Sequence, residues 1–512
     1  MIEENKSSMK NSVRRLVIAG IGVLIQIIWV VVLVMRLNQY SQIITLLTVA
    51  IELVLVLAVY SMDTNAAFKL PWIILITVAP IVGICVFFLF GRSGATKKVR
   101  TRYRKIDQQL FAYLNQDEQI IEELSKKDER LANDFKYLWK CASSPVYKNT
   151  DVKYYGDTCD AMAAQLEDMM QAKQFIFLEY HAIEMAESFQ ALRKVLMAKA
   201  REGVEIRILY DDAGCIGFLN PRFIKYMESM GIQCRVFNPI MPVLNIFMNN
   251  RDHRKITVID GRVAYTGGYN LADEYFNITH PYGQWKDSGI RFEGDAVQTA
   301  TILFLEMWNA LKEQDVDIEK YLPVYPYKAK EQGFFALYGD SPLDKEPAGE
   351  NVYMNLLRHA KKYIYFTTPY LILSDEMTRE LTGAAKRGVD VRIITPGIPD
   401  KKTIFQVTKS YYPQLLKHGV KIYEYTPGFM HEKQCICDGE IVVVGTINLD
   451  FRSLYLHFEN AALFCGYEAV SHVKEDFDAL FPICKDMSKE PSERTRRLRL
   501  SQLILRLFSP LM

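Results

Sequence analysis

Three long apolar runs fill most of the first ninety residues and set them apart from the rest of the chain. They span residues 16–35, 43–62 and 71–90, with Glu52 inside the second run and Pro80 inside the third. A helix of about 20 residues, rising 1.5 Å per residue, crosses a hydrocarbon core roughly 30 Å thick. The pattern therefore predicts two to three transmembrane helices ahead of the main fold.

The charges that flank these runs bear on how the anchor is oriented. Lysine and arginine cluster at residues 6–15, before the first run, and at 92–105, after the third. Both clusters favour the cytoplasmic side, yet three crossings would place them on opposite sides. Either one run does not cross or one cluster lies outside, and Pro80 suits a kinked or re-entrant third run. We expect a multi-pass protein of the cell membrane with its catalytic part at the cytoplasmic face.

Beyond the anchor, helix-like and strand-like patterns alternate, and the order occurs twice. The stretch AKAREGVEIRILYDDAG, from Ala198, matches GAAKRGVDVRIITPGIP, from Gly383. Each is typical of the end of an amphipathic helix, a glycine C-cap and a buried strand. This repeat predicts an α/β fold of two pseudo-symmetric sandwich halves, each with helices over a mixed sheet.

These patterns divide the chain into six segments. We expect a membrane anchor at 1–92, a charged helical linker at 93–150, a first half at 151–321, an inter-half segment at 322–350, a second half at 351–490 and a basic amphipathic helix at 491–512. The last segment sets arginines against a Leu-Ile-Phe face, which is typical of a helix on anionic lipid; docking on the protein body is the alternative. An apolar, proline-interrupted loop at 237–248 is expected to be buried or to dip toward the bilayer.

Composition narrows the class of protein. The chain has 512 residues, 49% of them hydrophobic, and a net charge of +2, so it can bury more than one core and has no basic excess. A nucleic-acid partner is therefore not indicated. The nine cysteines lack zinc or redox spacing, which favours reduced packing residues over disulfides.

One short motif, H-x-K-x4-D, occurs twice, and each copy is followed by a glycine-led turn that ends in asparagine. The residues are His253, Lys255, Asp260 and Asn270 in the first copy, and His431, Lys433, Asp438 and Asn448 in the second. Each motif sits on a predicted hairpin with its turn at Asp-Gly. Residues two apart on a strand share a face, so each histidine projects with its lysine. The aspartate, beside the turn, is expected to brace the hairpin rather than to react.

Paired imidazoles and ammonium groups suit transfer of a phosphodiester. One neutral imidazole attacks phosphorus, and the other gives a proton to the leaving alcohol and later takes one from the incoming alcohol. The lysines, with Asn270 and Asn448, would stabilise the non-bridging oxygens. We assign His253 as nucleophile and His431 as acid and base, with coupled titrations. A lysine beside each histidine would repel a cation, so neither a metal nor another cofactor is expected. The alternative interpretation is a pair of polar hairpin edges.

The duplicated motif resembles the phospholipase D superfamily, and the details resemble its bacterial cardiolipin synthase branch. These details include NNRDHRKITVIDGRVAYTGGYNLADEY, TPGFMHEKQCICDGEIVVVGTINLDFRS and the ending SPLM. The resemblance implies that one phosphatidylglycerol gives its phosphatidyl group to another, with release of glycerol, at a membrane of anionic lipid. It also implies that Asp287 and Glu459, behind the two motifs, hold the histidine rings. One departure is His457, where relatives usually carry an amide.

Two other functions stay open at this point. A membrane-bound phospholipase D-type phosphodiesterase, or a nuclease, would use the same residues with water in place of the acceptor alcohol. A non-catalytic membrane protein would need a degenerate site, whereas both motifs are intact. The anchor and the lack of basic excess argue against a nuclease, but the choice between transfer and hydrolysis rests on the resemblance. Neither the acyl chains nor an oligomeric state follow from the sequence.

Overall fold

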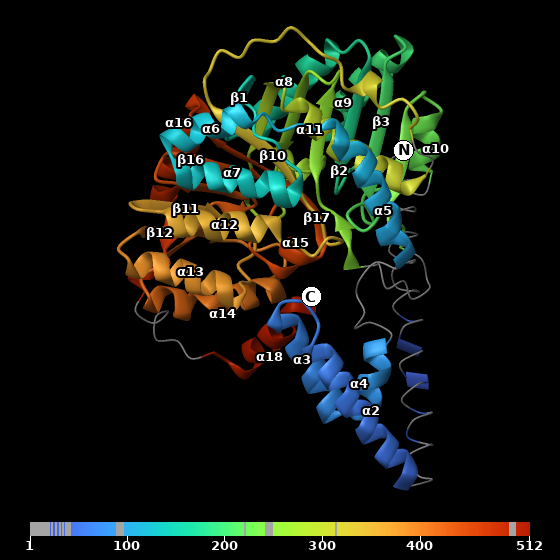
Figure 1. The fold of residues 1–512 in the computed structure, drawn as a ribbon, viewed down its shortest axis with the longest axis vertical. Coiled ribbons are helices and arrows are strands. Elements are labelled where there is room, and N and C mark those ends of the chain that lie inside the picture. Colours follow the sequence, from blue (N-terminus) through green and yellow to red (C-terminus); the bar gives the residue numbers. More distant parts are fainter. Residues whose placement is uncertain are drawn as a thin grey trace.

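A computed structural model describes residues 42–88, 97–219, 222–240, 249–312, 315–490 and 498–511, with isolated residues between 21 and 35. The first predicted crossing, 16–35, therefore lies largely outside the described residues. The same holds for 241–248 of the apolar loop and for 491–497 of the C-terminal segment. The two halves and the helices below them are shown in Figure 1.

Each half of the repeat forms one mixed sheet, as the sequence predicts. The first sheet has the order β1-β9-β7-β6-β2-β3-β4, and β2, β3 and β4 pair in parallel while the other pairs are antiparallel. Its strands in chain order are Thr150–Tyr155, Phe175–Tyr180, Glu205–Asp211, Gln233–Phe237, Lys255–Ile259, Val263–Gly267 and Gly289–Gly294. The hairpin of β6 and β7 carries the first motif.

The second sheet repeats this plan. Its order is β10-β17-β16-β15-β11-β12-β13-β18, and the two-residue strand β5, Arg251–Asp252, pairs with β17. Its other strands in chain order are Phe334–Asp340, Tyr363–Thr367, Asp390–Pro396, Lys421–Tyr425, Gln434–Cys437, Ile441–Gly445, His457–Cys465 and Cys484–Asp486. The hairpin of β15 and β16 carries the second motif, so each motif occupies the equivalent place in its half.

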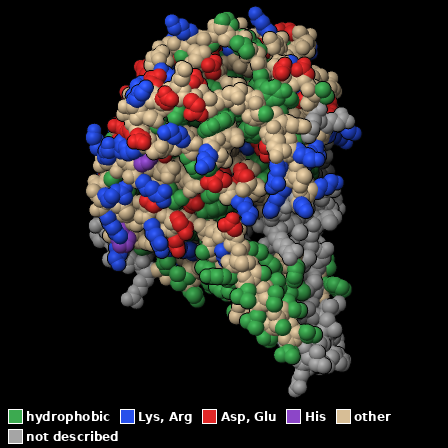
Figure 2. All heavy atoms as spheres, viewed as in Figure 1, with side chains coloured by type: hydrophobic (Ala, Val, Ile, Leu, Met, Phe, Trp, Pro, Cys, Tyr) green, Lys and Arg blue, Asp and Glu red, His purple; other side chains and the backbone are tan. Residues whose placement is uncertain are grey.

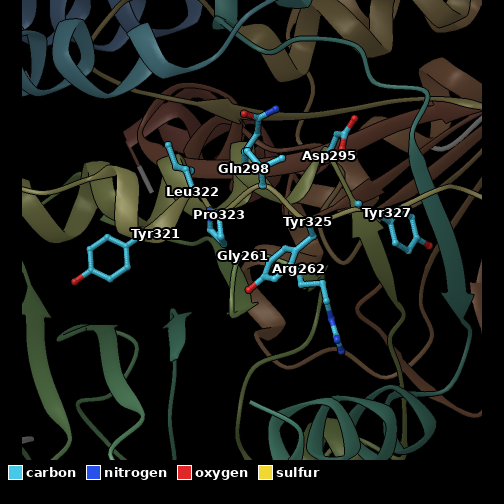
Figure 3. Close-up of a pocket in the computed structure, with 11 residues that line it drawn as sticks. Gly261, Arg262, Asp295, Gln298, Tyr321, Leu322, Pro323, Tyr325 and Tyr327 are labelled. Atoms are coloured by element: carbon cyan, nitrogen blue, oxygen red, sulfur yellow. The ribbon is translucent and has the colours of Figure 1, made fainter. Parts of the chain in front are cut away.

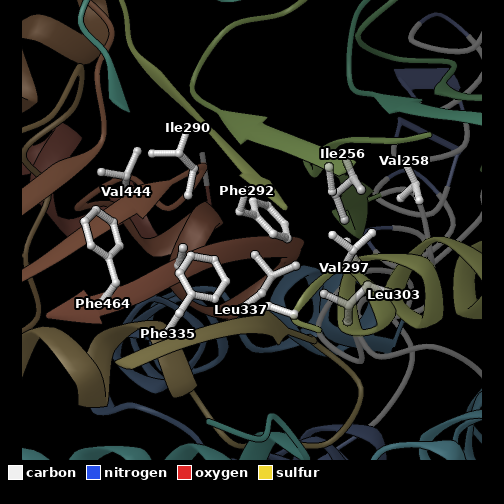
Figure 4. Packing of buried hydrophobic residues seen from close by; sticks show 14 of the residues in the cluster. Ile256, Val258, Ile290, Phe292, Val297, Leu303, Phe335, Leu337, Val444 and Phe464 are labelled. Carbon is white, nitrogen blue, oxygen red and sulfur yellow. The ribbon is translucent and has the colours of Figure 1, made fainter. Parts of the chain in front are cut away.

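The two sheets bury a common core between their inner faces. The Phe292 ring of the first sheet lies 5.0 Å from the Phe335 ring of the second between centroids, and Phe335 lies 6.2 Å from Phe464 of its own sheet (Figure 4). Helix α11, Val297–Leu311, is buried nearly all round in this core, as an apolar helix without a polar face should be. This shared core fixes the halves against each other.

Helices cover the outer faces. On the first sheet these are α8 (Thr158–Met170), α9 (Glu187–Arg201) and α10 (Phe223–Glu228). On the second they are α12 (Ala348–His359), α13 (Asp375–Lys386) and α14 (Lys402–Lys417), with α6 (Glu118–Lys127) and α7 (Glu129–Ala142). Helix α16, Glu468–Leu480, packs from the inner side through Val473 and Phe477.

Two of the predicted boundaries separate parts that the structure joins. The inter-half segment 322–350 contains β10, whose register with β17 runs from Phe334 opposite Cys465 to Asp340 opposite Glu459. The linker 93–150 is part of the folded body, because Tyr103 and Ile106 of helix α5, Lys97–Leu110, are buried in the shared core. Both segments alternate charged and apolar side chains, and only tertiary packing shows which side is covered.

The N-terminal helices are α2 (Gln42–Tyr60), α3 (Ala66–Val78) and α4 (Pro80–Val86). The third apolar run is therefore two helices rather than one continuous helix, because Pro80 begins a new helix after Ala79. A Cβ on Gly83 would lie 2.5 Å from the Leu75 carbonyl oxygen, so only glycine allows α4 to pack this closely on α3. None of the described helices combines the length and the apolar run that a bilayer crossing needs.

Candidate active site

The two motifs come together because each is hydrogen-bonded to the opposite half. The His253 amide donates to the Phe458 carbonyl at 2.9 Å, beside the pairing of β5 with β17. The His431 amide donates to the Lys286 carbonyl at 2.8 Å. There β14, Gly428–Met430, pairs in parallel with β8, Gln284–Lys286. Backbone hydrogen bonds thus hold both histidines at the interface between the halves.

Each imidazole takes its carboxylate partner from the opposite half. His253 Nδ1 lies 2.8 Å from Glu459 Oε2, and His431 Nδ1 lies 2.5 Å from Asp287 Oδ2. Both carboxylate side chains are fully buried. A carboxylate at Nδ1 holds the proton there and presents Nε2 of the ring as the reacting atom.

The Glu459 carboxylate is itself held by two hydroxyl groups. Thr446 Oγ1 donates to Oε2 at 2.5 Å, and Ser453 Oγ donates to Oε1 at 2.7 Å. Sequence reasoning did not single out either hydroxyl, although Thr446 lies inside the glycine-led turn after the second motif. Its counterpart in the first half is Gly268, where a Cβ would lie 2.0 Å from Asp287 Oδ1.

Both motif lysines are buried beside their histidines, each 1% exposed. Lys255 Nζ donates to the His253 carbonyl at 2.7 Å. Lys433 Nζ donates to the His431 carbonyl and lies 2.8 Å from Nδ1 of the same ring. Because that Nδ1 carries the proton shared with Asp287, the approach of Lys433 to it is an electrostatic contact rather than a second hydrogen bond.

Burial and mutual repulsion set the protonation states of this cluster. Burial, with Lys255 and Lys433 as further causes, holds the pKa of His253 well below its usual range, and the same causes act on His431. Burial also lowers the pKa of Lys255 to about 7, with Lys433 as a further lowering cause, and burial lowers the pKa of Lys433 to about 8. The buried cluster of imidazoles and amines is therefore an environment in which a bound anion favours the charged forms of the lysines and histidines.

Aromatic rings cover each imidazole at equivalent places. Trp285 lies 5.1 Å from His431 between ring centroids, and His457 lies 5.5 Å from His253. Trp285 and His457 each stand two residues before the carboxylate of their half. Burial lowers the pKa of His457 to about 3, so this third imidazole is neutral and serves as a wall. His181, which no motif indicated, adds a ring 5.1 Å from His253.

The motif aspartates lie at the hairpin turns. The Asp260 carboxylate accepts from the amides of Lys173, Gln174 and Phe175 at 2.7–2.8 Å. Asp438 accepts from the amides of 361–363 in the same way. Both aspartates have φ near +54°, at 53° and 54°. Each carboxylate thus ties its hairpin turn to the backbone at the start of β2 or of β11.

The two asparagines are buried, but they differ in their partners. Asn270 Oδ1 accepts from the Ala182 amide at 3.1 Å, and its Nδ2 donates to the Tyr275 hydroxyl at 2.8 Å. The Tyr275 ring lies 5.2 Å from the His431 ring. Asn448 is 5% exposed, and its Oδ1 has no hydrogen-bond partner among the described residues. Asn270 is thus bonded to Tyr275, the ring that lies beside His431.

One group of side chains has the spacing of metal ligands: His253, His457 and Glu459 offer atoms within 4.8 Å of one another. The donor set does not fit a cation. His253 Nδ1 carries the proton bonded to Glu459, and both Glu459 oxygens already accept from hydroxyls. The positive charges of Lys255 and Lys433 act on His253 from the same pocket. The arrangement suits an anion instead.

A separate cavity of about 130 Å³ lies beside the first hairpin turn (Figure 3). Its described lining includes Arg262, Tyr321 and Tyr325, but neither motif histidine. The Tyr325 hydroxyl donates to the Asp260 carbonyl at 2.9 Å. This cavity belongs to the turn that Asp260 braces, and it is distinct from the imidazole pocket.

Comparison with known proteins agrees with this geometry. A family model described as the phospholipase D-like domain of cardiolipin synthase matches residues 166–308 and 353–481, one stretch in each half. Cardiolipin synthase of Halalkalibacterium halodurans is 32% identical over 86% of this chain and 87% of its own length. Cardiolipin synthase 2 of Bacillus anthracis is 31% identical over 86% of each chain. A Streptococcus mutans protein named only as uncharacterized is 39% identical over 90% of this chain and 99% of its own.

A solved structure shares the fold. The phosphatidylserine synthase of Haemophilus influenzae aligns with a TM-score of 0.53 and 14% identity, over 70% of this chain and 93% of that one. At this identity the likeness concerns the arrangement of the two halves.

Proposed function

We propose that this chain, which belongs to the phospholipase D-like family of cardiolipin synthases, makes cardiolipin from two molecules of phosphatidylglycerol. The phosphatidyltransferase class follows from the family; the donor, the acceptor and the residue roles are the proposal. The observation that carries it is the pair of buried imidazoles, each fixed by a carboxylate of the opposite half and flanked by a lysine. Such a pair supplies a nucleophile and a proton donor to one phosphodiester.

In the first step, His253 Nε2 attacks phosphorus, and the bond from phosphorus to the glycerol oxygen breaks. His431 gives its proton to that oxygen, so glycerol leaves as a neutral alcohol. In the second step, His431 takes a proton from a glycerol hydroxyl of the second phosphatidylglycerol. That oxygen attacks phosphorus, the bond from phosphorus to nitrogen breaks, and cardiolipin forms while His253 is restored.

The division of roles requires a proton on His431 and none on Nε2 of His253. Burial, Lys433 and Lys255 hold the pKa of His431 well below its usual range while Asp400 opposes them, so the negative charge of the bound phosphodiester is needed to keep that ring protonated. His253, held by Glu459 through Nδ1, presents an unprotonated Nε2. Lys255 and Lys433 neutralise the phosphate, and the bound anion in turn favours their charged forms.

The exposed apolar surface supports work at an anionic membrane. Figure 2 shows hydrophobic side chains gathered over the end of the molecule where α2, α3 and α4 lie. Helix α18, Leu500–Phe508, packs beside α3 and α14 and exposes Leu500, Leu503 and Ile504, with Arg499 and Arg506 at its ends. This pattern suits an interfacial helix that meets anionic lipid. We extend the proposal to a catalytic body held at the cytoplasmic face of the cell membrane.

Incubation of the purified protein with phosphatidylglycerol alone in detergent micelles tests the reaction. Cardiolipin and glycerol in equal amounts are expected; phosphatidic acid in place of cardiolipin would show a hydrolase instead. His253→Ala and His431→Ala should each remove turnover, while His472→Ala, an exposed histidine, should not. With an activated substrate whose leaving group needs no proton, His431→Ala should accumulate a phosphatidyl group on His253. Substantial turnover by His431→Ala on phosphatidylglycerol would refute the two-histidine mechanism.

A further inference from the structure

A one-turn helix lies between the second motif and Glu459, the carboxylate that holds His253 of the first motif. Helix α15, Phe451–Tyr455, follows Asn448 and precedes Glu459. Asp450 caps it by accepting from the Ser453 amide at 3.0 Å. A helix of one turn has little stability of its own, so its position is fixed by what packs against it. Whatever holds α15 therefore acts on the residues that follow it.

The inner side of α15 reaches the reacting histidine in two hydrogen bonds. Ser453 is 1% exposed, and its hydroxyl donates to Glu459 Oε1 at 2.7 Å. The other oxygen of Glu459 holds His253 Nδ1 at 2.8 Å. A shift of α15 would move the Ser453 hydroxyl and release one side of the carboxylate that orients His253.

The outer side of α15 is covered by the N-terminal helix α3. Phe451 and Tyr455, four residues apart, lie on one face. The Phe68 ring meets both edge-on, at centroid distances of 5.6 Å and 5.5 Å. Asn65 Nδ2 donates to the Tyr455 hydroxyl at 3.2 Å, and that hydroxyl donates to Glu350 at 2.5 Å.

If the N-terminal helices only tethered the catalytic body to a membrane, α3 would not need to contact α15. Asn65 also donates to Glu376 Oε2 at 3.1 Å, so α3 is bonded to residues 311 and 390 positions away in the chain. Meanwhile α3 packs on α2 and α4, whose outward side chains are apolar. The same helix therefore faces the predicted membrane surface and the catalytic body.

We propose that the contact of α3 with α15 is a positioning contact for His253, through which the N-terminal helices set the geometry of the catalytic carboxylate. Phe68, Tyr455 and Ser453 are then positioning residues, and the series runs from Phe68 through α15 and Ser453 to Glu459 and His253. This inference rests on the proposed role of His253 as a reacting group. It predicts that loosening the anchor helix slows the chemical step even where substrate delivery does not depend on a membrane.

A double-mutant cycle on the full chain tests the connection, with soluble short-chain phosphatidylglycerol as substrate and total release of glycerol as readout. Ser453→Ala should lower kcat about 10-fold with KM little changed. A loss of this size is typical when a residue that orients a reacting side chain is removed. Phe68→Ala should lower kcat about 5-fold by the same route. The double variant should lose little more than Ser453→Ala, because both changes release the same carboxylate.

Leu70→Ala is the matched control, since it removes an apolar side chain from α3 at a position 52% exposed. It should leave kcat unchanged. If Phe68→Ala does not fold, as judged by thermal unfolding, Phe68→Leu and Tyr455→Phe carry the same cycle. Multiplicative losses from Phe68 and Ser453, or full kcat in the Phe68 variants, would overturn the proposal. Glycerol release is counted whether cardiolipin or phosphatidic acid forms, so a hydrolytic outcome would sink the proposed function and leave this test intact.

Discussion

His253 is oriented by a carboxylate from the other half of the chain: its Nδ1 lies 2.8 Å from Glu459 Oε2, 206 residues further along. The second motif repeats the relationship in reverse, with His431 Nδ1 2.5 Å from Asp287 Oδ2. Each histidine therefore receives the carboxylate at its Nδ1 from the opposite half. The site is complete only when the two halves are packed together.

Removing either crossed carboxylate should slow the reaction strongly. Glu459→Gln and Asp287→Asn keep the shape but lose the charge that fixes the proton on Nδ1, and each should lower kcat about 10- to 100-fold. Steady-state rates with phosphatidylglycerol micelles measure this. Glu468→Gln, an exposed acid on α16, is the control and should match the unmodified protein. Full kcat in both variants would show that the carboxylates do not orient the rings.

The pH profile should fall on the alkaline side as the lysines lose their charge. Burial lowers the pKa of Lys255 to about 7 and that of Lys433 to about 8. In the free enzyme, a rise of pH through this window converts ammonium to neutral amine, so kcat/KM should decrease. The bound phosphate favours the ammonium form, so kcat should decrease only at higher pH.

Arginine at one of these positions provides the check on that assignment. Lys255→Arg keeps its charge at all these pH values, so the first decrease in kcat/KM should move from about 7 toward the Lys433 value of about 8. The absolute rate should be lower, because a guanidinium does not replace an ammonium in shape. An unchanged alkaline limb would assign the titration to another group.

Gly268 should be intolerant of any side chain for a catalytic reason. A Cβ there would lie 2.0 Å from Asp287 Oδ1 and would push that carboxylate away from His431. Gly268→Ala should therefore lower kcat by about the 10- to 100-fold expected for loss of Asp287 itself. The double variant Gly268→Ala with Asp287→Ala should lose no more than Asp287→Ala alone.

The control for this glycine is Gly383 in α13, where a Cβ would meet its nearest side-chain atom at 3.8 Å. Gly383→Ala should leave kcat unchanged and slightly stabilise the helix. Additive losses at Gly268 and Asp287 would point to a backbone effect in place of displacement of the carboxylate.

Asp260 should matter for stability and not for chemistry. Its carboxylate accepts three backbone amides, so Asp260→Ala should lower the free energy of unfolding by about 3 kcal/mol. Asp260→Asn keeps one acceptor oxygen and tolerates the positive φ, so it should lose less. Denaturant unfolding measures both. A folded Asp260→Asn variant with kcat as low as that of His253→Ala would instead show that Asp260 takes part in the reaction.

Local sequence carries much of this fold. The matching stretches that begin at Ala198 and Gly383 predicted two α/β halves, and Asp-Gly at 260–261 and 438–439 predicted the hairpins. Both predictions succeed because turn formation and hydrophobic periodicity depend on only a few neighbouring residues. The motif also predicted that each histidine lies beside its lysine, since residues two apart on a strand share a face, and both pairs lie together in the structure.

Other features depend on contacts that no local pattern encodes. Pro80 marks the break in the third apolar run, but the close packing of α4 on α3 at Gly83 is visible only in the folded chain. Residues 322–350 supply a strand of the second sheet, since β17 offered an edge that a short apolar stretch could fill. The H-x-K-x4-D pattern includes neither Ser453 nor Thr446, and both stand out only because their hydroxyls donate to the Glu459 carboxylate.

The two copies of H-x-K-x4-D set a histidine and a lysine on one face of a strand in each half, and this can be predicted from the residues alone because it depends on near neighbours in the chain. Which acid contacts which imidazole, and how deeply the lysines are buried, follows only from the folded arrangement. These properties depend on contacts between segments that are hundreds of residues apart in the chain. Burial at these contacts lowers the pKa of Lys255, and the backbone hydrogen bond from His253 to Phe458 fixes the position of the histidine.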